Sequence, residues 1–538
     1  MSLGRVFARL GGLGKSGPEI AAWLLLVGAL RQAYVFISEN LATREDLWFL
    51  FSSDTVQYGL LYRDLFEDGF HFSGWNISHA PEYVQMSWSL LLQYLGGSLA
   101  AGHVLEALLQ PLILALALRF TLSRFATAWP AAGPAIVALT LTLISHGLGL
   151  NLIAFIWSNR HGFTVILSLI ALGLLLDAIS AGRRFLLLVA VAAAGVASDL
   201  LFVVWFVGPA LASLLSFARA VGYDRARRAG VAVVAGSVLG AVLFRVLTPV
   251  ATVGSKVEIQ LEQIWPALNR MSDVAFKSSP VELGFALTTL AGLLIAAALA
   301  VRSQNPVARI AAAWFGFMVL ATVAAVAATG APFREGAGYT RYLLAPEFCG
   351  IVVVVVAIGS TFSGRGVGAL LIALAVFILP GIRPLPKEVP SAASFYPPMV
   401  RCLDEVARRH KLNYGVADYW ISKYVTALSR TGVRVVSVTP RLDPFPDFTN
   451  IEWFLGGVGA RRHDRPVYTF AILGSMRPDS PGVSRVALDA LGPPIAVENC
   501  SGFEIRVLPE NADARIKEQF RASKRVRDYY ASQERPLP

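Results

Sequence analysis

The chain has 538 residues and a formal net charge of +11, with 55% hydrophobic and only 15% charged residues. Soluble domains carry about 25% charged residues, so this composition excludes a water-soluble enzyme, a disordered protein and a fibrous repeat. The apolar residues lie in runs of roughly 20, the length at which a helix crosses a hydrocarbon core of about 30 Å. We therefore expect a mostly α-helical polytopic membrane protein.

In chain order, we expect eleven membrane spans. One pair of runs is interrupted only by Ser198 and Asp199. We interpret this pair as two short spans, because a single helix would place Asp199 in hydrocarbon at a cost of about 2.5–3.5 kcal/mol. The runs lie at about 20–38, 101–118, 131–150, 162–179, 185–198, 200–217, 229–249, 284–301, 308–329, 343–360 and 366–382.

Lysine and arginine are distributed unequally between the two sides of these spans. The short segments on the side of the N-terminus carry more of them than the longer loops opposite. The positive-inside rule then predicts a cytoplasmic N-terminus. An odd number of spans places the C-terminal part outside, which means the periplasm if the protein lies in a bacterial inner membrane. The basic surplus is a topology signal, and no nucleic-acid partner is expected.

The composition changes after Pro380, where prolines cluster and charged residues become frequent. We expect a membrane domain at 1–382, which includes a first periplasmic loop at 38–100, then a linker at 383–397 and a soluble domain at 398–538. Alternating patterns in the last part predict an α/β fold. They predict helices at 398–410, 420–430, 483–491 and from about 512, and strands at 413–417, 433–438, 467–473, 495–498 and 503–507.

The chain has three cysteines and no CxxC spacing, which excludes a disulfide framework and a cysteine-rich zinc site. No cofactor is indicated; a divalent metal is possible and would be bound through oxygen or histidine. Cys402 and Cys500 both lie in the outer domain. In an oxidising compartment they could pair, and the alternative is two free buried thiols.

The first loop repeats apolar and aromatic residues at helical spacing, which predicts two helices lying in the membrane interface. Asp64 and Asp68 are four residues apart in the first of them. We expect these two carboxylates to form a solvated face. Asp54 comes at the start of this helix, where it could be a plain N-cap or a functional carboxylate.

His79 and Glu82 open the second interfacial helix, with a proline between them. Here too, a cap and a functional role are both open. Two arginine clusters lie at the outer ends of later spans, where arginines can be ordinary interfacial anchors. Facing an acidic loop, they also suit an anionic headgroup, because a guanidinium can grip phosphate with two hydrogen bonds. The clusters contain Arg160 with His161, and Arg334 with Arg341 and Tyr342.

These residues resemble a known pattern. Asp54-x-x-x-Tyr58-x-x-x-Tyr62-Arg63-Asp64-Leu65, followed by His79-Ala80-Pro81-Glu82-Tyr83 and a Leu95-Gly96-Gly97 break, is similar to the first periplasmic loop of GT-C glycosyltransferases. These multi-span enzymes use polyprenyl-phosphate-linked sugars. The resemblance extends to the span pattern, to Arg341-Tyr342 before a late span and to a C-terminal α/β domain.

The resemblance implies an enzyme that transfers a sugar from a polyprenyl-phosphate donor in the membrane to a glycan, lipid or protein acceptor. It makes Asp54 the catalytic base and places Arg341 on the donor phosphate, with Tyr342, Arg160 and Arg334 beside it. The family's acidic pair is Asp54-Thr55 here, and a basic residue common after the fifth span is replaced by Asp199. The side chains expected to line the substrate site are Tyr58, His79, Glu82, His161 and Asp199.

Two other classes of function remain open from the sequence. A transporter or flippase for a lipid-linked sugar would carry paired inverted repeats with helices broken at the bilayer midplane, and no internal repeat is visible. A non-catalytic protein of envelope assembly would use the membrane part to present its outer domain. Eleven spans are more than such an anchor requires.

Overall fold

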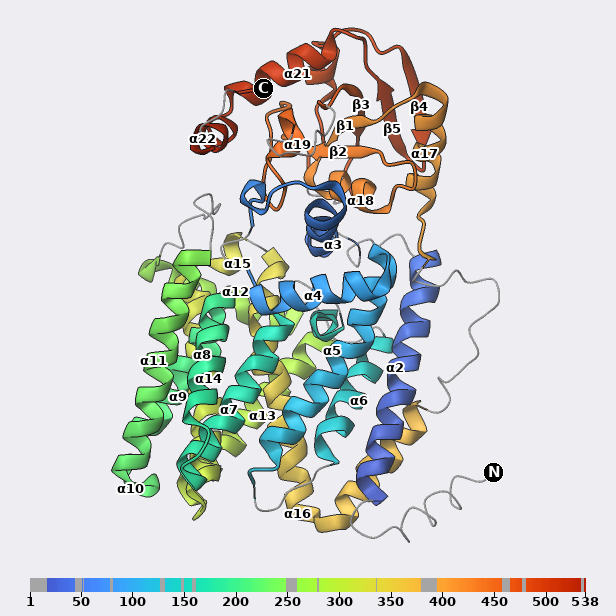
Figure 1. Ribbon diagram of the computed structural model, residues 1–538. Coiled ribbons are helices and arrows are strands. Elements are labelled where there is room, and N and C mark those ends of the chain that lie inside the picture. The colour runs from blue at the N-terminus through green and yellow to red at the C-terminus, as the bar shows by residue number, and fades with distance from the viewer. Residues whose placement is uncertain are drawn as a thin grey trace.

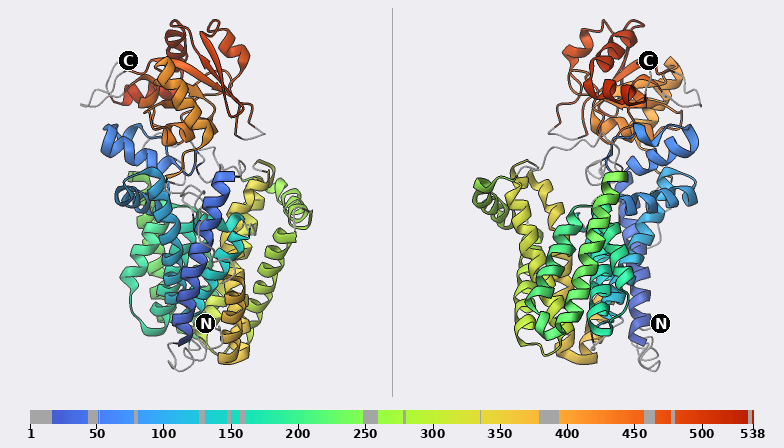
Figure 2. Two further views of the ribbon diagram at one scale, coloured as in Figure 1. Left: turned by 90° about the vertical axis from the view of Figure 1, so that its right-hand side faces the viewer. Right: turned by 60° about the vertical axis from the view of Figure 1, so that its left-hand side comes forward.

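The computed structural model is a bundle of long helices with an α/β domain at one end (Figure 1). The first-loop helices lie between the bundle and this domain, and two further views place the domain at the same end (Figure 2). The structure describes residues 17–43, 51, 53–77, 81–125, 131–146, 150–156, 161–247, 259–277, 280–334, 336–378, 394–456, 465–476, 480–533 and 537–538.

Among the described residues, seven helical stretches are long and apolar enough to cross a membrane, so the chain has the build of a multi-pass membrane protein. A helix suits this environment because it pairs its backbone polar groups internally. The seven include α2 (Gly17–Thr43), α5 (Leu99–Leu122), α7 (Gly162–Ala181), α11 (Tyr223–Leu247), α13 (Pro280–Arg302), α14 (Pro306–Ala328) and the start of α16 (Leu344–Ile378) with the turn before it.

The expected count of eleven spans is not confirmed. Three of the expected runs form apolar helices shorter than a full span: α6 (Ala132–Ser145), α8 (Phe185–Ser198) and the stretch made of η6 (Val203–Val207) and α9 (Gly208–Ser216). The runs at 343–360 and 366–382 fall largely within the single helix α16. The sequence between those two runs contains no proline that would stop a helix.

The expected break at Ser198 and Asp199 is present. Helix α8 ends at Ser198, and Asp199 follows with an extended backbone (φ −155°). Close packing supports this part of the bundle, because a Cβ added at Gly236 or Gly240 of α11 would lie 2.5–2.6 Å from carbonyl oxygens of α8. Small residues at such positions let membrane helices approach closely.

Helix α7 is the centre of the bundle, since 94% of its most apolar 18-residue stretch is buried inside the protein. The corresponding stretches of α11 and α13 are only 22% and 17% buried. These two helices therefore present most of their surface to the surroundings, as lipid-facing helices do.

The first loop forms helical segments at the end of the bundle, as the sequence predicted. They are α3 (Gln57–Tyr62), η3 (Arg63–Asp68), the short turn η4 (Phe72–Gly74) and α4 (Tyr83–Gly96). Helix α4 lies across the ends of the long helices, and α3 lies beneath the α/β domain (Figure 1). Further short elements at the ends of the bundle are η5 (Leu150–Phe155), α10 (Ala218–Val221), η7 (Leu261–Gln263), α12 (Ile264–Lys277), α15 (Ala331–Arg334) and η8 (Gly336–Leu343).

The C-terminal domain is built on a five-stranded sheet of order β2-β1-β3-β5-β4. Strand β1 pairs in parallel with β2 and β3, and β5 pairs antiparallel with β3 and β4. The strands are β1 (Tyr414–Ala417), β2 (Arg434–Ser437), β3 (Tyr468–Leu473), β4 (Ala496–Cys500) and β5 (Phe503–Val507); the helices are α17 (Pro398–His410), α18 (Tyr419–Leu428), α19 (Glu452–Leu455), α20 (Arg485–Asp489), α21 (Ala512–Ala522) and α22 (Lys524–Ser532).

These elements correspond closely to the predicted ones, which confirms the α/β domain. Cys402 on α17 and Cys500 at the end of β4 are bonded to each other, with Cα atoms 5.5 Å apart. The bond closes a long stretch of chain, and a bridge of this kind contributes roughly 2–5 kcal/mol to stability.

The first loop and the α/β domain are joined around Asp64. This side chain is fully buried, so the prediction that it belongs to a solvated face is wrong. It accepts hydrogen bonds from Trp453 Nε1 (2.8 Å), Asn450 Nδ2 (3.1 Å) and Arg434 (3.3 Å). Burial raises the pKa of Asp64 to about 6, although Arg434 opposes this. Asp68 pairs with the same arginine.

Backbone contacts extend this junction. Ile451 donates its N–H to Gly74 O at 2.8 Å, and Asn76 donates to Thr449 O at 3.1 Å. A Cβ at Gly74 would come within 2.2 Å of Asn450 Oδ1, so glycine is required for this approach. The loop and the domain therefore form one packed unit.

Removing the Asp64 carboxylate should weaken this unit. Asp64→Ala leaves the guanidinium of Arg434 and the indole N–H of Trp453 without their shared acceptor. The loss should be about 3–5 kcal/mol, as for breaking one side of a buried ion pair. The melting temperature of the purified protein measures it. Glu67→Ala, an exposed neighbour, is the control, and equal melting of both variants would contradict the prediction.

Candidate functional site

Three of the residues singled out in the sequence meet at the end of the bundle. Glu82, His161 and Asp199 each offer a ligand atom, and these atoms lie within 4.8 Å of one another. His161 Nδ1 is 2.7 Å from Asp199 Oδ2 and 3.2 Å from Glu82 Oε1. Glu82 and Asp199 are buried and His161 is partly exposed. Side chains separated by up to 117 positions thus form one polar centre, which we call the carboxylate–histidine cluster.

The backbone around the cluster is held in an unusual conformation. Glu82 and His161 have positive φ angles of 48° and 61°, which cost free energy in residues other than glycine. Glu82 N–H donates to Ser198 O at 2.7 Å, and Val84 N–H donates to Ser198 Oγ at 3.0 Å. The start of α4 is therefore hydrogen-bonded to the end of α8.

Glu82 does not cap its helix. It occupies the N-cap position of α4, yet its side chain makes no capping hydrogen bond. Its carboxylate instead accepts the backbone N–H of His161 at 3.1 Å and the hydroxyl of Tyr58 at 3.2 Å. Of the two roles left open for Glu82 in the sequence, the cap is wrong.

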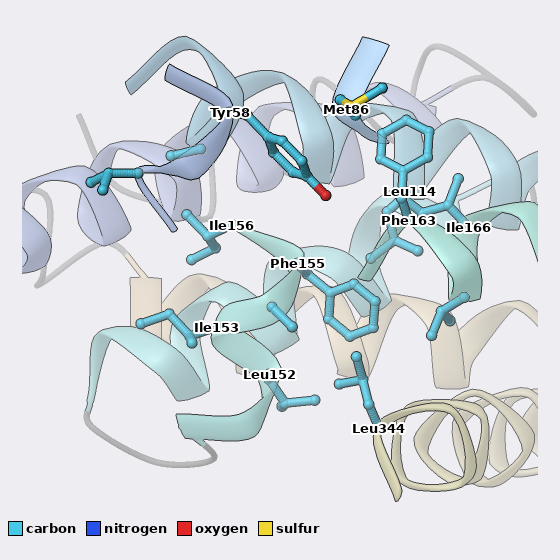
Figure 3. Close-up of a cluster of buried hydrophobic side chains, with 14 of the residues drawn as sticks. Tyr58, Met86, Leu114, Leu152, Ile153, Phe155, Ile156, Phe163, Ile166 and Leu344 are labelled. Atoms are coloured by element: carbon cyan, nitrogen blue, oxygen red, sulfur yellow. The ribbon is translucent and has the colours of Figure 1, made fainter. Parts of the chain in front are cut away.

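Tyr58 closes the cluster from the side of α3. Burial raises its pKa well above the usual value, and Glu82 raises it further, so the phenol keeps its proton and can donate it. Figure 3 shows Tyr58 beside a layer of buried apolar side chains that includes Phe155, Phe163 and Leu344. The ring of Tyr58 is thus buried among apolar side chains, while its hydroxyl hydrogen-bonds to Glu82.

Charges within the cluster support one another. Burial by itself lowers the pKa of His161, but Asp199 and Glu82 outweigh it and raise the pKa to about 10. Burial likewise opposes ionisation of Asp199, but His161 and hydrogen bonds from Thr164 Oγ1 (2.7 Å) and Leu201 N–H (2.9 Å) lower its pKa. A protonated imidazole between two carboxylates is the form that this geometry stabilises.

The same three residues fit a divalent metal. One imidazole nitrogen and two carboxylates are a common donor set for zinc and for manganese. Their ligand atoms already converge, and Tyr58, Thr164 and the N–H of Leu201 orient the carboxylates as outer partners of metal ligands do. A cation would have to replace the proton on His161 Nδ1, because metal binding requires neutral imidazole.

Asp54 lies in a second polar centre, at the junction with the α/β domain. It does not cap α3, because the N-cap of that helix is Val56 and no side chain caps it. Asp54 Oδ1 instead accepts the hydroxyl of Tyr419 from α18. Lys423, one turn further along α18, is close enough for Asp54 to raise its pKa. The plain-cap interpretation of Asp54 is therefore wrong.

Arg341 and Tyr342 lie between the two centres. An NH2 group of Arg341 donates to Tyr342 Oη at 3.0 Å, and the guanidinium carbon is 5.0 Å from the centre of that ring. The Tyr342 ring centroid is 5.9 Å from that of His161. Arg341 also interacts electrostatically with Tyr419. The ring of Tyr342 thus lies near the cluster, and the charge of Arg341 lies near enough to Tyr419 to act on its pKa.

The remaining predicted residues are not placed. His79 and Arg160 lie outside the described residues, and of Arg334, which ends α15, only the backbone is described. Sequence reasoning missed Tyr419 and Lys423. The one available signal was a lysine on the otherwise apolar face of a predicted helix.

Comparison with known proteins adds one similarity. No family model and no curated protein match the chain. Among solved structures, the oligosaccharyltransferase of Archaeoglobus fulgidus in complex with zinc and sulfate matches with a TM-score of 0.40 and 12% sequence identity, over 83% of this chain and 67% of that chain. The chain is a mostly helical protein with an α/β domain and, in the part that the structure describes, seven candidate spans. Any function must be argued from its own residues.

Binding of a divalent cation to the cluster is testable by thermal stability. Excess Zn²⁺ or Mn²⁺ should raise the melting temperature of the purified protein, since a ligand at 100 times its Kd adds about 2.7 kcal/mol. Glu82→Gln and Asp199→Asn should each abolish the increase, whereas Glu67→Gln should keep it. If neither ion raises the melting temperature of the wild-type protein, the cluster is a protonated carboxylate–histidine centre and not a metal site.

Proposed function

We propose that this protein is a membrane glycosyltransferase that moves a sugar from a polyprenyl-phosphate donor to a cell-envelope glycan, lipid or protein. The observation that carries the proposal is the arrangement around Tyr419, whose hydroxyl donates to the carboxylate of Asp54 and whose rise in pKa is opposed by the nearby positive charge of Arg341. A base and a cation at one interface suit the transfer of a group away from a phosphate.

Asp54 acts as the general base. The acceptor hydroxyl attacks the anomeric carbon and gives its proton to the Asp54 carboxylate, while the bond from that carbon to the phosphate oxygen breaks and polyprenyl phosphate leaves. The transition state resembles an oxocarbenium ion, as in glycoside hydrolysis. A single direct displacement inverts the anomeric centre.

Arg341 binds the phosphate that leaves. Its side chain is exposed, and a planar guanidinium can hold two phosphate oxygens at once. Tyr342 orients it through the 3.0 Å hydrogen bond. Arg160 and Arg334 are proposed beside it from the sequence, and His79 on the substrate side.

The cluster of Glu82, His161 and Asp199 would hold a divalent cation, which when bound supplies charge neutralisation for a phosphate. Independently of any cation, these residues with Tyr58 fix the start of α4 against α7 and α8. They thereby shape the wall of the site next to Tyr342.

The bundle suits a lipid donor. Its long apolar helices can accommodate a polyprenyl chain alongside them, and the first-loop helices lie at the end of the bundle next to the α/β domain (Figure 1). We place this end and the α/β domain on the outer side of a bacterial inner membrane, with the N-terminus in the cytoplasm. The bond between Cys402 and Cys500 supports this side, because disulfides persist in oxidising compartments.

Sugar transfer from a synthetic polyprenyl-phosphate sugar by the purified protein tests the proposal. Asp54→Asn keeps an acceptor oxygen for Tyr419 but cannot take up a proton. Its turnover should fall by about 10²-fold or more with near-normal donor binding. Glu67→Gln, an exposed acid in the same loop, should be silent. Donor movement across vesicles without transfer would identify a flippase instead.

The role of Arg341 is tested by Arg341→Lys, which keeps the charge but loses the planar fork. Turnover should fall by about 10- to 100-fold, corresponding to the roughly 1.5–3 kcal/mol of a charged hydrogen bond. Arg485→Lys, an exposed arginine of the α/β domain paired with Glu504, is the matched control. Wild-type turnover in Arg341→Lys would make Arg341 an interfacial anchor.

A further inference from the structure

Helix α18 of the α/β domain reaches the first loop next to Asp54. Two bonds between the segments fix it there. Ser53 Oγ donates to the carbonyl oxygen of Tyr419 at the start of the helix, and Arg63 donates to Thr426 O at 2.8 Å near its end. Asp418 caps the helix through Ile421 N–H at 3.0 Å. The helix is therefore held at both ends relative to the candidate base.

Tyr419 is the residue of α18 that contacts Asp54. Its hydroxyl donates to Asp54 Oδ1. Its ring is packed edge-on against Trp420 (centroids 4.9 Å apart) and Phe445 (5.5 Å). The aromatic neighbours fix the ring, and the ring fixes the hydroxyl, so the carboxylate has a preferred rotation.

Lys423 supports Tyr419 from the other face. Its side chain is 1% exposed, and Nζ lies 4.0 Å from the centre of the Tyr419 ring and 5.4 Å from that of Phe448. Nζ donates to Asp447 O at 2.8 Å. Burial lowers the pKa of Lys423 to about 7, against the charges of Asp54 and Asp447. A buried amine is costly, and this one faces the phenol that holds the base.

We propose that the α/β domain completes the catalytic site, with Tyr419 as the positioning residue for Asp54 and Lys423 as the group that fixes Tyr419. The inference rests on the proposed function and extends it. The α/β domain then supplies two residues, Tyr419 and Lys423, to the site that contains Asp54 of the first loop. Neither half of the protein then contains a complete site.

Tyr419→Phe removes one hydroxyl and keeps the aromatic packing. We expect kcat to fall by about 10- to 100-fold with the donor KM unchanged and the melting temperature close to wild type. Tyr424→Phe is the matched control, because Tyr424 is a buried tyrosine of the same helix and lies outside the site. Its kcat should stay at the wild-type value.

The double variant Asp54→Asn, Tyr419→Phe separates positioning from a general structural effect. If Tyr419 acts through Asp54, the double variant turns over no more slowly than Asp54→Asn alone. If Tyr419 only stabilises the fold, the two losses multiply, which overturns the inference. A Tyr419→Phe variant as active as Tyr424→Phe overturns it as well.

Lys423→Met and Lys423→Arg complete the test. Lys423→Met should lower kcat in the same direction as Tyr419→Phe, and Lys423→Arg, which keeps a cation over the ring, should recover part of the loss. Equal activity of Lys423→Met and wild type would remove Lys423 from the inference. If the wild-type protein transfers no sugar, the proposed function fails and the inference with it. If Asp54→Asn loses turnover while Tyr419→Phe and Lys423→Met keep wild-type turnover, only the inference is refuted.

Discussion

Buried carboxylates hold together the end of the protein where the bundle, the first loop and the α/β domain meet, because a charge taken out of water needs a partner. Asp64 finds its partners on the α/β domain, Asp199 on the segments before and within α7, and Glu82 on α3 and before α7. Each pairing joins segments that are distant in the sequence. The orientation of the loop, the bundle and the domain follows from these few contacts.

The helices and the α/β domain could be predicted from the sequence because their signals are local. Apolar runs gave most of the long helices, and the alternation of patterns gave all five strands. The errors arose where local signals were ambiguous. Nothing in the sequence between the last two runs distinguishes a loop from a continued helix, so α16 was expected as two spans.

The candidate site could be predicted only in part. Asp54, Glu82, His161 and Asp199 were each recognised as unusual polar residues near the ends of apolar segments, but no local pattern says that three of them meet. Asp64 was expected in water because its spacing suits a surface helix, and only the tertiary contact with Arg434 buries it. Tyr419 was missed because its partner lies 365 positions away.

The junction at Asp64 also sets an order of events during synthesis. Asp64 and Arg434 are 370 residues apart, so at roughly 5–20 residues per second the ribosome needs about 20–70 s to produce the second partner after the first. During this interval the first loop has been synthesised, but the domain that covers it has not. The nascent chain must therefore keep Asp64, Asn76 and their neighbours hydrated or shielded by other proteins until the α/β domain folds onto them.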